Sequence, residues 1–286
     1  MRSSPSTNAG PQQESEAPAS LKPTGGAPVG AQTLLRGLDV IEAVADGPIT
    51  LTDLAKKLGL TRSTVHRLAT ALTERRYLTF TPRQGYQFGP KLLELGFVAQ
   101  RQTDILDIAR PQLEALAAAT GDTVHFGILD GQRALYLGKI PGRRRVEISS
   151  RVGDRHPLTS TGLGKALLLD DAPDRWRELF LFDQANGAPP AKYETWLARM
   201  DGYAAAGHAF DLEENEDLIR CVAAPIRDAA GAIVAAMSVS SAAQYMTDAR
   251  MQTLSGEVRA AAEEISRELG WTGVRAAPPP PPAKPK

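Results

Sequence analysis

The chain contains one cysteine, Cys221, among 286 residues, which excludes an intramolecular disulfide framework. No apolar run reaches the eighteen or so residues needed to cross a bilayer, and the N-terminus lacks the apolar core of a signal peptide. Paired cysteines, a His-x-x-x-His motif and a glycine-rich phosphate loop are also absent. These absences predict a cytoplasmic protein that has no membrane partner, no metal and no cofactor.

The composition is that of an ordinary globular protein, with 42% hydrophobic and 23% charged residues and a formal net charge of zero. A length of 286 residues exceeds one typical domain and favours two. Residues 1–30, rich in Ser, Pro, Gly, Ala and Gln, cannot bury enough apolar surface to offset the entropy of ordering. Residues 272–286 include five consecutive prolines. Both ends are therefore predicted to be disordered tails.

Residues 51–72 contain two short helical patterns separated by Gly59. The first repeats apolar residues at spacings of three and four, with Thr52 as the expected N-cap and Gly59 as the stop. The second is expected to start near Thr61 and to bury Val65. Its polar face carries short hydroxyls, an imidazole and guanidinium groups that donate to phosphates and can read base edges. The members of this face are Arg62, Ser63, Thr64, His66 and Arg67.

Two further features favour a winged helix-turn-helix over an ordinary helical hairpin. Alternating runs on either side of Pro82-Arg83-Gln84-Gly85 predict a β-hairpin behind the second helix. Residues 51–91 carry eight basic and two acidic side chains, a local charge of +6 in a chain of zero net charge. A helix-turn-helix, a wing and a basic patch together indicate DNA binding.

Helical patterns flank this segment on both sides. Apolar residues from Leu34 to Val44 predict a first helix that ends at Gly47-Pro48. A stretch that includes Leu92, Leu95 and Phe97 predicts a linker helix, a dimer seam or both. Pro111 is expected in the first turn of a further helix that ends before Gly121. We therefore expect the winged domain to comprise residues 31–90 and the linker helix to comprise residues 91–108.

From Thr123 onward, the spacing of apolar residues changes to the alternation that is typical of β-strands. Asp130-Gly131 between two apolar runs predicts a hairpin, and residues 145–151, with Val146 and Ile148 on one face, predict another strand. Further strands are expected over residues 221–225 and 232–240, and a helix rich in small residues over 162–169. Trp176 and Trp196 are expected in the core, and a long helix is expected to start after Thr247 and stop at Gly270. Residues 109–271 thus predict an α+β domain.

Four blocks in order resemble the IclR family of bacterial transcriptional regulators, over about residues 31–271. The first is LTDLAKKLGLTRSTVHRLATALTERRYL followed by GYQFGPKLLELG; the others are TGDTVHFGILDG, SSRVGDRHPLTSTGLGKALL, and FDLEENEDLIRCVAAPIRD with IVAAMSVS. The resemblance implies an N-terminal winged helix-turn-helix domain, a linker helix and a C-terminal effector-binding domain of the GAF-like α+β type. It also implies a homodimer or dimer of dimers that binds double-stranded operator DNA and a small organic acid. RNA polymerase is a further candidate partner.

Site residues follow from the resemblance only where the sequence matches. Operator reading falls on the polar face of the second helix, with Arg83 and Gln84 in the wing as backbone contacts. In the wall of the effector pocket, His156 replaces a residue that is often apolar in the family. The implied pocket consists of Gly162, Leu163, Asp211, Ile219, Cys221, Ser238 and Ser240, with Val146, Ile148 and His156 in the less constant wall.

The residue types themselves suit a small carboxylate. Gly162 and Gly164 would let an anion approach backbone N–H groups at a helix N-terminus. Ser238 and Ser240 are two apart on a strand, so both could donate to one carboxylate. Asp211 would repel a bare anion and is expected to accept a hydrogen bond from a ligand hydroxyl or from water. Sugar acids, aromatic acids and short oxo acids remain open as the effector.

Two rival classes remain. Five carboxylates between Asp211 and Asp217, with His125, His156 and His208 elsewhere, raise the alternative of a small-molecule-metabolising enzyme fused to a DNA-binding module. A solvated acidic loop is the plainer interpretation, and a buried apolar filler is the plainer interpretation of Cys221. A DNA-binding module that senses nothing is the third class. The sequence does not distinguish repressor from activator.

Overall fold

The computed structural model describes residues 31–145 and 148–274, which form two compact units divided between Gln102 and Thr103. The predicted tail at residues 1–30, the part of the predicted tail 272–286 beyond residue 274, and the predicted pocket residue Val146 lie outside the described residues. Each unit has its own hydrophobic core.

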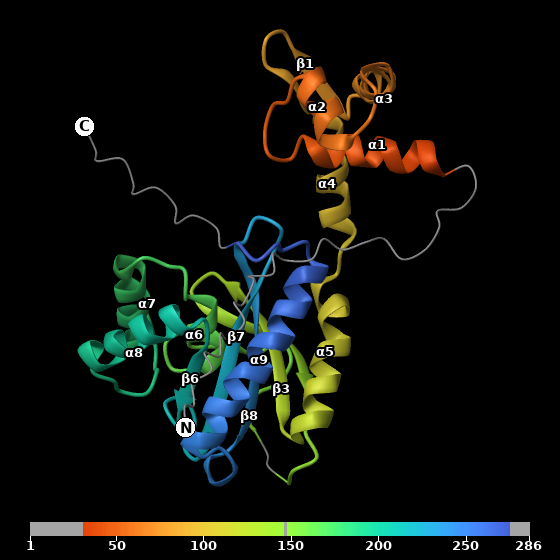
Figure 1. Cartoon of the computed structure of the whole chain (residues 1–286). Helices are drawn as coiled ribbons and strands as arrows, with labels where there is room; N and C mark the ends of the chain where they lie inside the picture. The colour runs from red at the N-terminus through yellow and green to blue at the C-terminus, as the bar shows by residue number, and fades with distance from the viewer. Residues whose placement is uncertain (1–30, 146–147, 275–286) are drawn as a thin grey trace, which may run out of the picture. The chain divides into compact units, whose positions relative to one another are not determined.

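The first unit is a helical core with a two-stranded wing (Figure 1). Its elements are α1 Gln32–Ala43, α2 Leu51–Leu58, α3 Arg62–Glu74, β1 Leu78–Thr81, β2 Gly85–Phe88 and α4 Pro90–Gln102. Val40, Leu54 and Val65, one from each of the first three helices, are fully buried together. The strands β1 and β2 pair antiparallel, and an isolated bridge joins Ile49 to Tyr86. The predicted winged helix-turn-helix is confirmed.

The turn between α2 and α3 follows from its capping residues. Gly59 has a φ of 63° and ends α2 in the left-handed conformation, and the Thr61 hydroxyl accepts the Thr64 N–H at 3.3 Å at the start of α3. Both predictions are confirmed. The predicted cap Thr52 is wrong, because the chain is still extended at Thr50, whose hydroxyl oxygen accepts the Asp53 N–H at 3.3 Å.

The first helix differs from its prediction in length and in its buried face. It ends at Ala43 instead of Gly47-Pro48, and Leu34 and Leu38 are 67% and 44% exposed. Burial comes instead from its C-terminal half, where Val40, Ala43 and Val44 lie in the core. A core this small is filled by little more than one helical turn of α1. The N-terminal apolar residues are left on the surface.

The expected linker over residues 91–108 is not one helix. The helix α4 ends at Gln102, and α5 (Ile105–Thr120) starts behind Asp104, whose carboxylate accepts the Leu106 N–H at 2.9 Å. Pro111 therefore lies inside α5 and not in its first turn. A carboxylate that satisfies orphan N–H groups is a stronger start signal than the proline. The predicted stop is confirmed, since Gly121 has a φ of 72°.

The second unit is an antiparallel sheet with helices on both faces (Figure 1). The strand order is β5-β4-β3-β8-β7-β6. The strands are β3 Thr123–Asp130, β4 Arg133–Ile140, β5 Arg155–His156, β6 Ala209–Leu212, β7 Ile219–Arg227 and β8 Ile233–Ala242. The helices after α5 are α6 Gly162–Leu167, α7 Pro173–Ala185, α8 Tyr193–Ala206, the 3-10 helix η1 Ala243–Tyr245 and α9 Asp248–Glu268.

The helices α5 and α9 pack together on one face of this sheet, and α6 packs on the other, where a Cβ at Gly127 would lie 3.2 Å from Leu163 Cδ2. Trp176 and Trp196 are buried, as predicted. The predicted strand over residues 145–151 is wrong for its described part, since Ile148–Ser150 form no strand. The edge strand β6 was not predicted, because its four residues lie beside an acidic loop that masks the alternation. The predicted α+β class is confirmed.

Candidate functional site

The exposed face of α3 is polar in its N-terminal half. Arg62, Ser63, His66 and Arg67 are exposed, while Val65 and Ala69 on the opposite face are fully buried. Thr64 differs from its neighbours, because it is half-buried and its hydroxyl lies 2.8 Å from the Thr61 hydroxyl. Four of the five predicted base-reading side chains on α3 thus point to solvent.

Ion pairs divide the basic residues of this unit into two groups. Lys57 pairs with Asp46 at 2.8 Å, and both Arg76 (2.8 Å) and Lys91 (3.2 Å) pair with Glu94. Five of the eight basic residues between 51 and 91 have no ion pair within residues 31–145 and 148–274: Lys56, Arg62, Arg67, Arg75 and Arg83. Two of them project from α3, and Arg83 lies with exposed Gln84 at the tip of the wing. These are the cations available to a phosphate backbone.

In the second unit, register aligns polar residues from neighbouring strands on one face of the sheet. Asp211 of β6 lies opposite Cys221 of β7, which lies opposite Ser240 of β8, which lies opposite Thr123 of β3. Partners in an antiparallel ladder point to the same side. One row further along, Ser238 lies opposite His125, which lies opposite Lys139 of β4. The face covered by α6 is therefore polar at its centre.

A narrow pocket opens on this face, with about 20 Å³ of space, little more than one water molecule needs. It is lined by His125, Tyr136, Ile148, Ser150, His156, Thr161, Asp211, Asn215, Glu216, Ile219, Cys221 and Ser240. Six predicted effector residues are among them: Ile148, His156, Asp211, Ile219, Cys221 and Ser240. In this state the pocket holds water-sized groups only.

The two histidines of the pocket differ in their partners. His125 is buried, with Nε2 2.9 Å from the Ser150 hydroxyl and Nδ1 3.3 Å from the Ser240 hydroxyl. Burial, together with the nearby charge of Lys139, lowers the pKa of His125 to about 3, so its imidazole is neutral at physiological pH. Burial also lowers the pKa of His156, whose Nε2 is buried without a hydrogen-bond partner among the described residues. His156 Nε2 is therefore a group that a ligand could satisfy.

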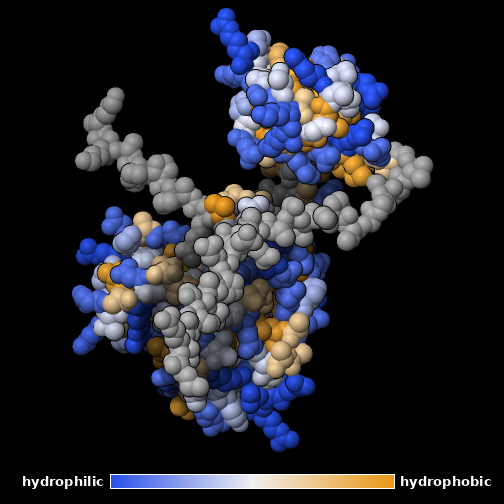
Figure 2. Space-filling model, in the orientation of Figure 1, coloured by the Kyte–Doolittle hydropathy of each residue, from blue (hydrophilic) through white to orange (hydrophobic). Residues whose placement is uncertain are grey.

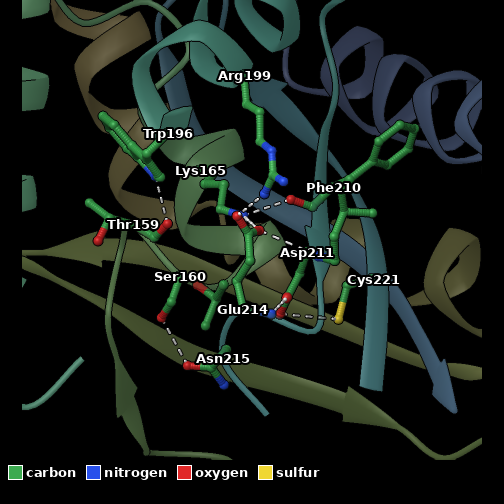
Figure 3. A network of polar contacts seen from close by, with 12 residues as sticks. Thr159, Ser160, Lys165, Trp196, Arg199, Phe210, Asp211, Glu214, Asn215 and Cys221 are labelled. Carbon is green, nitrogen blue, oxygen red and sulfur yellow. Dashed lines mark hydrogen bonds and ion pairs between the residues drawn. The ribbon is translucent and has the colours of Figure 1, made fainter. Parts of the chain in front are cut away.

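Asp211 accepts a backbone hydrogen bond and lies near a buried ammonium (Figure 3). Its Oδ1 accepts the Glu214 N–H at 2.8 Å, and burial raises its pKa to about 6, while nearby Lys165 opposes that rise. Lys165 is 1% exposed; its Nζ donates to the Phe210 carbonyl at 2.8 Å and forms an ion pair with Glu214. Arg199 binds the other oxygen of Glu214 at 2.7 Å. This network fixes the end of β6, which carries Asp211, and the loop that follows it.

Three predicted pocket residues do not line it. A Cβ at Gly162 would lie 3.2 Å from Cys221 Cβ, so this glycine lets α6 pack closely on the sheet. Leu163 is fully buried against the sheet at Gly127, and Ser238 is buried beside His125. One of the N–H groups at the start of α6 is already bonded, because the Thr161 hydroxyl accepts the Gly164 N–H at 3.0 Å.

Sequence reasoning missed several lining residues. Alternation along β3 places His125 on the same face as Thr123, and this signal was in the sequence. Tyr136 depends on a register shift between Phe126 and Gly127, which no spacing reveals. The others, Ser150, Thr161, Asn215 and Glu216, lie in loops or at a helix cap. Their approach to the pocket is set by tertiary structure.

No helix among the described residues is long and apolar enough to cross a membrane, and the same residues contain no cluster of three metal-ligating side chains. The geometry defines a class: a winged helix-turn-helix protein with a second, sheet-based α+β domain that encloses a polar pocket.

Comparison with known proteins agrees. The profile of the IclR helix-turn-helix domain matches residues 33–82, and that of the bacterial transcriptional regulator IclR C-terminal domain matches residues 97–267. The regulator XynR of Escherichia coli is 32% identical over 84% of this chain and 98% of its own. The regulator BhcR of Paracoccus denitrificans is 34% identical over 83% of this chain and 87% of its own.

Solved structures extend the similarity. Thermotoga maritima IclR is 29% identical, with a TM-score of 0.53 over 84% of this chain and 99% of its own. The Agobacterium tumefaciens repressor BlcR shares the fold, with a TM-score of 0.71 over 85% of this chain and 99% of its own, at 24% identity. The chain belongs to the IclR family and is a DNA-binding transcriptional regulator.

Proposed function

We propose that the chain binds double-stranded operator DNA through α3 and the wing, and that a small carboxylate bound in the pocket of the second unit controls this binding. The observation that carries the proposal is the pocket itself. It gathers a carboxyl with a raised pKa and an imidazole nitrogen that has no hydrogen bond among the described residues and lies 3.9 Å from the Asp154 carboxylate, in a domain of a DNA-binding protein. A core that served stability alone would have no reason to retain such groups.

The DNA contacts are proposed for Arg62, Ser63, His66 and Arg67 on α3 and for Arg83 and Gln84 in the wing. An arginine that reads a base contributes about 1–3 kcal/mol to operator affinity. Arg62→Ala and Arg67→Ala should each weaken binding to DNA from the protein's own promoter region by that amount, measured by fluorescence anisotropy. Lys57→Ala is the matched control, because the Lys57 ammonium already pairs with Asp46. Unchanged affinity in the double arginine variant would refute the interface.

We propose that the operator is bound by a homodimer or a dimer of dimers. A single winged domain reads one half-site, and a symmetric pair reads two. On α4, Leu93, Leu95, Phe97 and Val98 are exposed, with Leu93 at 79% and Phe97 at 61%. Figure 2 shows hydrophobic side chains in places on the otherwise polar surface. Exposed apolar side chains that lie together favour an interface with a second copy.

The ligand is proposed to be a small carboxylate such as a sugar acid, an aromatic acid or a short oxo acid. The narrow pocket must widen to admit any of them. A thermal-shift series with such acids tests this, because a ligand that binds only the folded state raises the melting temperature. A series in which no acid raises it would favour a regulator that senses nothing. The proposed location is the cytoplasm, with RNA polymerase as a candidate partner on the bound promoter.

A second candidate is an enzyme, favoured by Asp211 and His156 in one pocket with shifted pKa values. The relatives XynR and BhcR are named as transcriptional regulators, which is consistent with a sensor that leaves its ligand intact. A turnover assay on each acid that raises the melting temperature separates the two. Consumption of the acid would establish the enzyme.

A further inference from the structure

The pocket has no positive charge of its own for an anionic ligand. None of the described residues that line it is lysine or arginine, and two of them, Asp211 and Glu216, are acidic. Its histidines have lowered pKa values. A carboxylate confined there would lose hydration and face two like charges. A cation that reached the ligand from outside the lining would offset these like charges.

Two ammonium groups lie close to the pocket. Lys165 is already paired with the Glu214 carboxylate, whereas Lys139 has no ion pair among the described residues. Lys139 lies opposite His125 in the β3–β4 ladder, so both side chains are on the pocket face of the sheet. Its charge is close enough to contribute to the lowered pKa of His125. Its Nζ donates to the carbonyl groups of Ile148, at 2.8 Å, and Ser150, at 2.6 Å. These described partners of the ammonium are neutral dipoles.

Ile148 and Ser150 separate this ammonium from the pocket. Both line the pocket, and both also line a cleft of about 390 Å³ on their other side, together with Lys139 and Arg151. Apart from the two bonds from Lys139, few bonds among the described residues hold them there. Ser150 bonds to His125 at 2.9 Å, and Ser149 donates to Glu216 at 2.9 Å, but no strand pairing adds to these bonds. A small displacement of residues 148–150 would join the two spaces at Lys139 Nζ.

We propose that Lys139 is the residue that binds the carboxylate of the ligand, and that the ligand takes the place of the Ile148 and Ser150 carbonyls at its ammonium. This inference rests on the proposed function, since it assumes an acid in this pocket. The exchange is favourable because an ammonium bonds more strongly to a carboxylate than to a neutral carbonyl. The ligand's far end then meets His156 Nε2 and Asp211, which suits a small acid that also bears a hydroxyl group.

Cys221 provides a test that needs no knowledge of the natural ligand. It is the one cysteine of the chain and it lines the pocket. Iodoacetate and iodoacetamide are nearly the same size, and only the first carries a carboxylate. Burial raises the pKa of the Cys221 thiol, so the reaction is followed at high pH, where the thiol proton passes to the buffer and each reagent alkylates the thiolate with loss of iodide. The ratio of the two rates, followed by intact mass on the full chain, reports how well the pocket attracts a carboxylate.

Lys139→Met should lower the iodoacetate rate at least about tenfold and the iodoacetamide rate less than about twofold, because a charge interaction at contact distance is of this size. Lys139→Gln, which keeps a donor for the carbonyls, should give the same result if the methionine variant folds poorly. Lys139→Arg should preserve the ratio. Lys192→Met, at an exposed lysine that precedes α8, is the control and should leave both rates unchanged.

Three outcomes would overturn the proposal. The rates could fall equally for both reagents, the ratio could stay unchanged, or Cys221 of the folded chain could resist both reagents while the urea-unfolded chain reacts. Failure of the proposed function would look different. In that case the alkylation ratio would still depend on Lys139, while promoter DNA binding would ignore every acid.

Discussion

Replacing Lys165 by methionine removes the ammonium beneath the pocket and keeps most of the side-chain volume. Lys165 is 1% exposed and its Nζ binds the Phe210 carbonyl at 2.8 Å and the Glu214 carboxylate. Without it, a half-buried carboxylate and a buried carbonyl lose their partner, and Asp211 loses its nearest positive charge. Breaking one side of such a buried pair costs about 3–5 kcal/mol of the free energy of unfolding.

Arg199→Met is the matched control, because Arg199 binds the same Glu214 carboxylate at 2.7 Å but is itself 41% exposed. An exposed pair contributes about 0–1 kcal/mol. Urea unfolding followed by tryptophan fluorescence reports this unit alone, since the three tryptophans, at 176, 196 and 271, all lie in it. A Lys165→Met loss no greater than that of Arg199→Met would refute the assignment of Lys165 as the cation that supports the pocket.

Three other substitutions, one of them with a control variant, test the pocket, the wing and the dimer interface. Burial raises the pKa of Asp211 from 3.8 to about 6, so the folded state loses stability as the pH rises through that interval. In urea unfolding, the free energy of unfolding of Asp211→Asn should therefore exceed that of the wild type by about 2–3 kcal/mol at about pH 7.5 and equal it below about pH 4. A difference that does not change with pH would show that the raised pKa is not the cause. A Cβ at Gly85 would lie 2.1 Å from the Ile49 carbonyl oxygen at a φ of +97°, so Gly85→Ala should destabilise the first unit by at least about 1–3 kcal/mol. Gly96→Ala, with open space around it, should not destabilise that unit in circular dichroism melting. Phe97→Glu should weaken self-association at least about tenfold in sedimentation with secondary structure unchanged, and equal association would remove α4 from the interface.

The sequence determines the first unit well, because local signals decide it. Gly59 and Thr61 are consecutive stop and start signals, and the alternation around Pro82 predicts the wing. The failures there have a common cause. The position of the cap at Thr50 depends on how far the preceding chain stays extended, and the length of α1 depends on how large a core it has to cover. The spacing of apolar residues in the sequence indicates neither.

The pocket could be predicted only in part. Residues on long strands, such as Cys221 and Ser240, follow from alternation once the strands are known. Ser150, Asn215 and Glu216 belong to loops, and their positions depend on the buried pair of Lys165 and Glu214 and on the bonds to His125. The sequence did not indicate that Lys165 in α6 forms a buried ion pair, because its partner Glu214 is 49 residues away in the chain.

The most direct test of the central claim is the dissociation constant of the full chain for its own promoter DNA, measured with and without the acid that raises its melting temperature most. The account predicts a change of at least about fivefold, which is the lower range of coupling between two sites. The same change should vanish in Lys139→Met, which keeps an intact DNA interface. An unchanged dissociation constant for every acid that stabilises the protein would contradict the account.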